Sequence, residues 1–268
     1  MSAIFSLVER VREEQPLVFN ITNVVVANFV ANGMLALGAS PVMAYDRREV
    51  SDMARMSNAV ILNIGTLTEE TVEAMIIAGK AANEKGIPVI FDPVGYGATP
   101  YRIEASERIL QEVKVDILRG NAGEISQIAG ADAVMKGVDA GEVSGNMIDL
   151  VQQVAKKHRT IVIATGKIDY LSDGNRLYQV ENGHPYLPKV TGSGCLLSST
   201  IGAFAAVEKD YLKASLAASS FYGAAAEQAA QKAGHHGPGS FQYEFLNALS
   251  VLGHEEWQQL AKYKEVSE

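Results

Sequence analysis

Short apolar runs alternate with amphipathic stretches along most of the chain. A continuous apolar run bounded by polar or glycine residues is typical of a strand buried on both faces of a parallel sheet. Apolar residues at helical spacing, such as Leu7, Val8 and Val11, indicate amphipathic helices between these runs. The pattern predicts strands at 17–22, 40–44, 59–65, 87–92, 115–118 and 160–166, and helices at 3–14, 24–37, 68–85, 102–113, 122–130 and 144–157.

The order of these elements predicts an α/β fold in which helices cross between the strands of a mostly parallel central sheet. Residues 168–190 interrupt the alternation, because Asp173-Gly174 between two alternating runs is a hairpin signal. No internal repeat, linker or change of composition divides the chain, so residues 1–268 are predicted to form a single domain. The last part of the chain is predicted to be helical, at 195–207, 210–232, 241–250 and 255–264.

The composition is that of a globular protein, with 47% hydrophobic and 20% charged residues. No segment approaches the ~20 consecutive apolar residues of a membrane span. The net charge of −8, without a cluster of basic and aromatic residues, argues against a nucleic-acid partner. Charged Glu9, Arg10 and Arg12 stand where a signal peptide needs an apolar core. Because the one cysteine, Cys195, excludes an intramolecular disulfide, we expect a cytoplasmic protein.

Polar or glycine residues follow nearly every predicted strand. Ligands of open parallel sheets bind outside the carboxyl ends of the strands, so these residues are the first candidates for a site. Each of them alone is more simply explained as a turn residue, whereas the whole set is harder to explain in that way. The set comprises Asn20, Thr22, Asn23, Met43, Asn63, Gly65, Asp92, Arg119, Asn121, Thr165 and Gly166.

The segment 190–198 gives the strongest local signal. Its glycines precede an apolar helix, so the backbone N–H groups of Gly192, Ser193, Gly194 and Cys195 and the helix dipole converge on one point, as in an anion site. The segment is not a Walker loop, and Leu197 stands where a dinucleotide-binding fingerprint has its third glycine. A tight turn that leads into a helix explains the same residues.

Cys195 has two interpretations. Most single cysteines fill a core, but a helix N-terminus lowers the pKa of a thiol and makes thiolate available. A Cys-dependent hydrolase would need a histidine partner, and no hydrolase signature surrounds Cys195. His235-His236 lies in a glycine-rich loop and is expected to be solvated rather than metal-bound, since no Cys/His spacing indicates a zinc site.

Two carboxylates follow predicted strands. Asp92 ends an apolar strand and precedes Pro93, which cannot continue it. Glu124 follows Asn121 by three residues, a spacing typical of a capping box at the start of a helix. A first-turn carboxylate favoured by the helix dipole is the simplest interpretation of Glu124 alone.

Taken together, seven segments resemble the hydroxyethylthiazole kinase family, in that family's order and over nearly the whole chain. The most specific are 191–195, where Gly-x-Gly is followed by Cys in place of the Asp of related kinases, and 37–43, Leu-Gly-Ala-Ser-Pro-Val-Met. The Asn-x-x-Glu element at 121–124 is shared by ribokinase-like kinases in general. The seven segments are 20–23, 32–43, 92–95, 121–124, 164–166, 191–195 and 237–241.

The resemblance implies a ribokinase-like fold without a lid domain and an enzyme that uses ATP as co-substrate and Mg²⁺ as cofactor. It implies transfer of the γ-phosphate to the primary alcohol of 4-methyl-5-(2-hydroxyethyl)thiazole, a salvage step toward thiamine, in a homotrimer with the site between subunits. The roles it implies are ATP binding by Arg119 and Thr165, substrate binding by Met43, Gly194 and Asn23, a catalytic position facing the hydroxyl for Cys195, and organisation of magnesium by Glu124 and Asp92.

Phosphoryl transfer depends mainly on positioning and charge stabilisation, so a thiol in place of a carboxylate base is compatible with it. Two alternatives remain open at the level of the sequence. Another ribokinase-like kinase of a vitamin or pyrimidine alcohol would differ in substrate, and a Cys-dependent hydrolase or transferase with 192–195 as an oxyanion hole would form a covalent intermediate without ATP. A nucleotide-binding protein without turnover is a weaker third.

Overall fold

The computed structural model describes residues 4–130 and 140–266, and the strands in this part of the chain form one nine-stranded sheet with the order β2-β1-β3-β4-β5-β6-β7-β8-β9. The first six are parallel to one another, while β7, β8 and β9 continue the sheet antiparallel. The strands are β1 Leu17–Ile21, β2 Ser40–Met43, β3 Ala59–Asn63, β4 Val89–Asp92, β5 Ile117–Asn121, β6 Ile161–Thr165, β7 Asp169–Ser172, β8 Leu177–Val180 and β9 Tyr263–Glu265.

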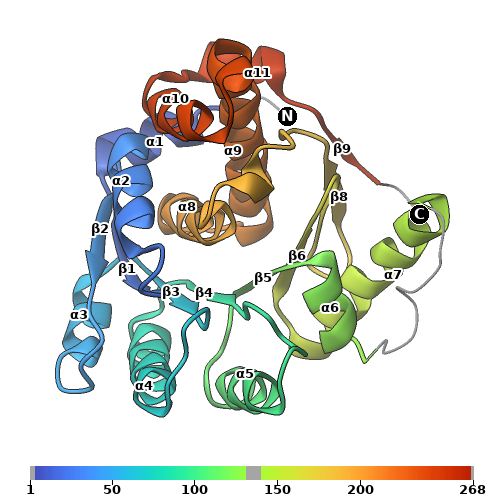
Figure 1. Cartoon of the computed structure of the whole chain (residues 1–268). Helices are drawn as coiled ribbons and strands as arrows, with labels where there is room; N and C mark the ends of the chain where they lie inside the picture. Colours follow the sequence, from blue (N-terminus) through green and yellow to red (C-terminus); the bar gives the residue numbers. More distant parts are fainter. Residues whose placement is uncertain (1–3, 131–139, 267–268) are drawn as a thin grey trace.

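Helices cover both faces of the sheet (Figure 1). One layer contains α1 Leu7–Glu14, α2 Ala27–Leu37, α8 Ser193–Val207, α9 Tyr211–Ala233, α10 Pro238–Val251 and α11 His254–Leu260. The other contains α3 Val50–Met56, α4 Glu69–Lys85, α5 Pro100–Glu112, α6 Ala122–Ile128 and α7 Ala140–His158. Short 3₁₀ helices, η2 Leu187–Lys189 and η3 Gly234–His236, precede α8 and α10. The prediction of an α/β fold with a mostly parallel sheet is confirmed.

Both faces of the central strands are buried, which explains their continuous apolar sequences. Along β3, Ile61 belongs to the core under α8, whereas Val60 and Leu62 belong to the core on the other face. Because successive side chains of a strand point to opposite faces, a strand between two helical layers is apolar at every position. The fold therefore has two hydrophobic cores, one on each side of the sheet.

Helix α8 packs across the middle of the sheet, and this position places its N-terminus near the ends of the central strands. Gly202 lies directly on the sheet, because a Cβ there would be 2.5 Å from Cδ1 of Ile61. Larger side chains of α8, such as Leu196 and Phe204, are fully buried. The close approach at Gly202 holds the first turn of the helix over the strand ends.

The predicted hairpin at 168–190 is confirmed as β7 and β8, but two elements differ from the prediction. The helix expected at 255–264 ends at Leu260, and 263–265 instead forms β9 against β8. Its sequence, Tyr-Lys-Glu, is polar because the strand lies at the edge of the sheet, so hydropathy gives no strand signal. The short helix α3 was not predicted. In the described residues, no helix is both long and apolar enough to span a bilayer.

Candidate active site

The first turn of α8 lies against side chains from the ends of β3, β4 and the loop after β1. Sγ of Cys195 accepts hydrogen bonds from Nδ2 of Asn23 at 3.4 Å and from Nδ2 of Asn63 at 3.2 Å. Nδ2 of Asn63 also donates to Oδ2 of Asp92 at 3.0 Å, and Oγ of Ser198 donates to the same oxygen at 2.7 Å. Four elements distant in sequence thus meet at one buried polar cluster.

Asn63 has its amide orientation determined by the backbone. Its Oδ1 accepts hydrogen bonds from the N–H of Gly65 at 3.0 Å and from Nδ2 of Asn23 at 3.1 Å. An oxygen in that position requires the NH₂ group to point toward Asp92 and Cys195, since only the oxygen accepts. Nδ2 of Asn63 therefore donates to both the Asp92 carboxylate and the thiol.

Of the two interpretations of Cys195, the structure favours a buried thiol over one activated by the helix N-terminus. Burial raises the pKa of the thiol to about 11, and the charge of Asp92 acts in the same direction. The hydrogen bonds from Asn63 and Asn23 and the charge of Arg119 oppose this rise. Desolvation penalises the thiolate more than its neighbours favour it, so Cys195 is a protonated thiol at neutral pH.

Asp92 is 1% exposed and has an unusual environment for a carboxylate. Burial raises its pKa to about 6, opposed by Arg119, whose Nη1 lies 3.7 Å from Oδ2. Its second oxygen, Oδ1, is buried without a hydrogen-bond partner among the described residues. A buried acceptor without a partner is energetically costly.

Glu124 forms the capping box predicted from its spacing. Its Oε2 accepts from the N–H of Asn121 at 2.7 Å, while Oδ1 of Asn121 accepts from the N–H of Glu124 at 2.9 Å. Its Oε1 accepts from the N–H of Gly95 at 2.7 Å. Both carboxylate oxygens are thus held by main-chain N–H groups, which leave further lone pairs on each oxygen.

Asp92 and Glu124 are the two carboxylates that could help to hold a magnesium ion. Mg²⁺ is typically held by one or two carboxylates together with substrate phosphates and water, rather than by a full set of protein ligands. The free Oδ1 of Asp92 and the fixed carboxylate of Glu124 fit that donor set. Within residues 4–130 and 140–266, no three His, Cys, Asp or Glu side chains cluster closely enough to hold a metal by themselves.

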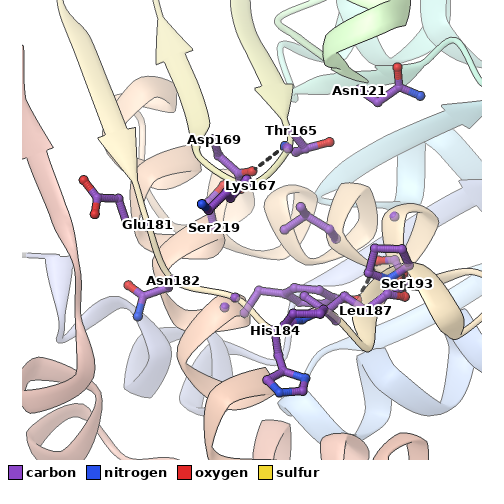
Figure 2. Close-up of a pocket in the computed structure, with 18 of the residues that line it drawn as sticks. Asn121, Thr165, Lys167, Asp169, Glu181, Asn182, His184, Leu187, Ser193 and Ser219 are labelled. Carbon is purple, nitrogen blue, oxygen red and sulfur yellow. Dashed lines mark hydrogen bonds between the residues drawn. The ribbon is translucent and has the colours of Figure 1, made fainter. Parts of the chain in front are cut away.

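On the opposite side of the α8 N-terminus, Arg119 and Thr165 face a cavity of about 800 Å³. Nη2 of Arg119 donates to Oγ1 of Thr165 at 2.7 Å, and Oγ1 of Thr165 lies 3.2 Å from the carbonyl oxygen of Gly120. Nε of Arg119 is buried without a partner in the described chain. The cavity lies between the β6–β8 strands and helices α8 and α9, and Figure 2 shows Thr165 and Asp169 on one side of it and His184 and Leu187 on the other.

Some of the residues predicted for an anion site already form hydrogen bonds within the protein. The N–H of Ser193 donates to the carbonyl oxygen of Val190 at 3.2 Å, and its Oγ donates to that of Leu187 at 2.7 Å. Gly192 is the N-cap of α8, with φ +90°, and a Cβ there would be 2.8 Å from Val26. The N–H groups of Gly194 and Cys195 lie in the first helical turn, where no partner exists within the helix.

The remaining predicted residues lie at different distances from this cluster. Asn23 belongs to it, whereas Met43 lies half-buried at the end of edge strand β2, paired in register with Asn20 of β1. The side chain of Asn20 forms a buried hydrogen bond within the protein, because its Oδ1 accepts from Oγ of Ser199 at 2.6 Å. Ser198, which donates to Asp92, was not predicted as a site residue; its position one helical turn after Gly194 is the one sequence signal for it.

The hydrolase interpretation finds no support in this geometry. The hydrogen-bond partners of the Cys195 sulfur in the described part of the chain are two asparagine amides, and none is a histidine. His235 and His236 are exposed on η3. A thiol with a raised pKa and no adjacent base is a poor nucleophile.

Comparison with solved structures defines first the class of fold. A ribokinase-like superfamily protein from Enterococcus faecalis shares 10% identity, with a TM-score of 0.65, over 89% of this chain and 87% of that one. Pyridoxal kinase of Bacillus subtilis, in an ADP complex, shares 16% identity with a TM-score of 0.59, over 79% of this chain and 91% of that one. At these identities the similarity establishes a ribokinase-like fold alone.

Two closer matches define the family. The hydroxyethylthiazole kinase protein from Pyrococcus horikoshii is 43% identical over the full length of both chains, with a TM-score of 0.92. The model of the hydroxyethylthiazole kinase family matches residues 8–255. The chain belongs to the hydroxyethylthiazole kinase family.

Proposed function

We propose that this enzyme transfers the γ-phosphate of ATP to the primary alcohol of 4-methyl-5-(2-hydroxyethyl)thiazole, a salvage step toward thiamine. The observation that carries the proposal is the arrangement around the α8 N-terminus. A cavity with Arg119 lies on one side and the Asn23–Asn63–Cys195 cluster on the other, in a chain that is 43% identical over its full length to a protein named for this activity.

The nucleotide is proposed to occupy the cavity, with its phosphates toward α8. Arg119 and Thr165 face this space, and the free N–H groups of Gly194 and Cys195 point from the helix N-terminus. Aligned N–H groups and a guanidinium stabilise the charge that develops on a transferred phosphoryl group. The volume of about 800 Å³ is within the usual range for ligand sites.

The alcohol is proposed to approach from the side of Asn23 and Met43, with its hydroxyl facing Cys195. Its oxygen attacks the γ-phosphorus, the bond to the β-phosphate oxygen breaks, and ADP leaves. In a loose transition state the hydroxyl proton departs late and passes to an oxygen of the transferred phosphate, so a neutral thiol that orients the alcohol is sufficient. We assign Cys195 the task of orienting the hydroxyl, since burial keeps it protonated.

Magnesium is proposed to be held by phosphate oxygens, with Asp92 through Oδ1 and Glu124 as the protein carboxylates, partly through water. When bound, the ion neutralises charge on the phosphates. Asp92 and Glu124 are oriented by Asn63 and Ser198 and by the N–H groups of Gly95 and Asn121, respectively. Their orientation is thus set by the protein before any ligand binds.

A homotrimer with the thiazole site between subunits is proposed for the assembly. Met43 ends the edge strand β2, and Val24, Val25 and Leu35 are apolar side chains that are 73%, 68% and 62% exposed. They lie on or just before α2, on the same side of the site as Asn23. A cytoplasmic location is proposed because the single cysteine suits a reducing compartment.

The proposal is tested by measuring ADP release with ATP and magnesium across a panel of alcohols. The thiazole alcohol is expected to be the preferred acceptor, with pyridoxal and a hydroxymethylpyrimidine as competing candidates. Preference for either competitor would assign the enzyme to another vitamin-alcohol kinase of the same fold. ATP binding without ADP release for any acceptor would contradict a kinase.

A further inference from the structure

Arg102 of helix α5 links the loops that follow β3 and β4. Its Nη1 donates to the carbonyl oxygens of Ile64 at 2.8 Å and Val94 at 2.5 Å, and its Nη2 donates to that of Gly65 at 2.9 Å. Arg102 forms no salt bridge within residues 4–130 and 140–266, so its hydrogen bonds go to main-chain carbonyls rather than to carboxylates. One guanidinium thus ties two separate loops together.

Each of these loops holds one half of the candidate active site. In the first, the N–H of Gly65 fixes Oδ1 of Asn63, and a Cβ on Gly65 would lie 2.7 Å from Nδ2 of Asn23. The loop therefore packs against both amides that donate to Cys195. In the second, the N–H of Gly95, next to Val94, holds Oε1 of Glu124 at 2.7 Å.

The conformation of the second loop depends on the same side chain. Gly95 has φ +72°, and a Cβ there would lie 3.3 Å from Cδ of Arg102. The stem of the arginine therefore fills the space beside Gly95 while its guanidinium binds the preceding carbonyl. A planar fork that donates in fixed directions can bridge carbonyls on two loops, which a lysine ammonium on a flexible stem does poorly.

We propose that Arg102 is a positioning residue for phosphoryl transfer: by bridging the loops after β3 and β4, it fixes the distance between the Asn63–Cys195 cluster and the Glu124 carboxylate. Arg102 touches neither Cys195 nor Glu124 and acts through Gly65 and Gly95. The catalytic part of this inference rests on the proposed function, whereas the structural part does not. Reacting groups displaced by about 1 Å lose rate by as much as 10²-fold, so the bridge affects turnover without touching substrate.

The structural part is tested without substrate or metal, through alkylation of Cys195. Because Cys195 is the one cysteine of the chain, iodoacetamide incorporation reports on this site alone. Cys195 of the Arg102→Ala variant is expected to be alkylated at least about fivefold faster than Cys195 of the parent. Without the bridge, Asn23 and Asn63 are less firmly held and no longer cover the sulfur. Arg108→Ala is the matched control, because Arg108 lies on the same helix but pairs with Glu73 and Glu112 at the surface.

Rescue by added guanidinium ion distinguishes loss of the Arg102 bridge from a general loss of protein stability. Guanidinium ion at about 20 mM, far below denaturing concentration, is expected to slow alkylation of Arg102→Ala toward the parent rate, whereas urea at the same concentration is not. In Arg102→Lys the alkylation of Cys195 is expected to remain fast, because lysine keeps the positive charge but lacks the planar guanidinium that bridges the two loops. Equal alkylation of Arg102→Ala and Arg108→Ala, or equal rescue by urea, would overturn the bridge.

The catalytic part is read from steady-state kinetics of the same variants. Arg102→Ala is expected to lower kcat by about 10- to 100-fold with little change in the Michaelis constants, and guanidinium is expected to restore part of the loss. A change confined to the Michaelis constants, with kcat preserved, would overturn the positioning role. If the parent itself fails to phosphorylate the thiazole alcohol, the proposed function fails, while the alkylation rates still decide whether Arg102 bridges the loops.

Discussion

The guanidinium of Arg119 packs directly against Gly194, so that a Cβ at Gly194 would be 2.8 Å from Nη1. Arg119 lies on β5, which pairs with β6, and Thr165 of β6 is its hydrogen-bond partner. The first turn of α8 packs against this part of the sheet. The contact places a cation at the N-terminus of a helix, whose dipole repels it. A phosphate in the adjacent cavity that contacts both the guanidinium and the helix N-terminus would be stabilised by both.

Gly194→Ala is therefore expected to displace Arg119 and weaken ATP binding. The Michaelis constant for ATP should rise about 10- to 100-fold, because charge-assisted hydrogen bonds are worth roughly 1.5–3 kcal/mol. Gly239→Ala is the matched control, since nothing lies within 4 Å of a Cβ at that position. An ATP constant equal to that of the control would show that Arg119 does not bind phosphate from this position.

Substitutions of Cys195 test its role in orienting the alcohol. An aspartate there would accept the same hydrogen bonds from Asn23 and Asn63 and is ionised more readily than a thiol whose pKa is raised to about 11. Cys195→Asp is expected to keep substantial turnover, whereas Cys195→Ala and Cys195→Ser should lose at least about tenfold. Turnover is measured at saturating ATP for all three. Full activity of the alanine variant would mean that the side chain plays no part in the reaction.

The pH dependence of stability tests the environment of Asp169 beside the cavity. Burial raises the pKa of Asp169 to about 6, and a hydrogen bond from the N–H of Gly166 and the charge of Arg119 oppose the rise. The folded state therefore keeps a proton between about pH 4 and 6 that the unfolded chain has lost, so this group lowers stability as pH rises across that window.

Asp169→Asn should remove that contribution. The free energy of unfolding of the parent should fall from pH 4 to pH 7 by up to about 3 kcal/mol more than that of the variant, because one pKa unit corresponds to 1.36 kcal/mol. Urea unfolding at several pH values measures both. Parallel profiles between pH 4 and pH 7 would show that the pKa of the Asp169 carboxyl is not raised in the folded protein. Above pH 7 the two profiles should run parallel, because both states of the parent are then ionised.

Mixed oligomers test whether the thiazole site lies between subunits. Met43→Asp and Cys195→Ala subunits, each with low activity alone, should regain activity when mixed, because one composite site then contains both native residues. Activity should also fall on dilution as the oligomer dissociates. Mixed assemblies, verified by mass, that show no recovery would place Met43 and Cys195 in the same site of one chain.

The sequence alone determined the order of the strands from β1 to β8, most of the helices between them and the residues at the strand ends. Those signals are local: a strand between two helical layers is apolar at every position, and a capping box such as Asn121 with Glu124 spans three residues. The motif residues from 191 to 195 were recognisable for the same reason, since a turn before a helix is written in consecutive residues.

Only the tertiary structure decided the chemistry of those residues. The pKa of Cys195 is raised by burial and by Asp92, which lies on another element, so its position at a helix N-terminus does not decide its protonation. Ser198 and Arg102 act through contacts with residues far from them in the chain or with backbone carbonyls, which leave no pattern in sequence. Strand β9 exists because β8 offers a free edge, not because Tyr263–Glu265 is apolar. Desolvation, charge proximity and strand pairing are set by spatial neighbours, and the fold alone chooses those.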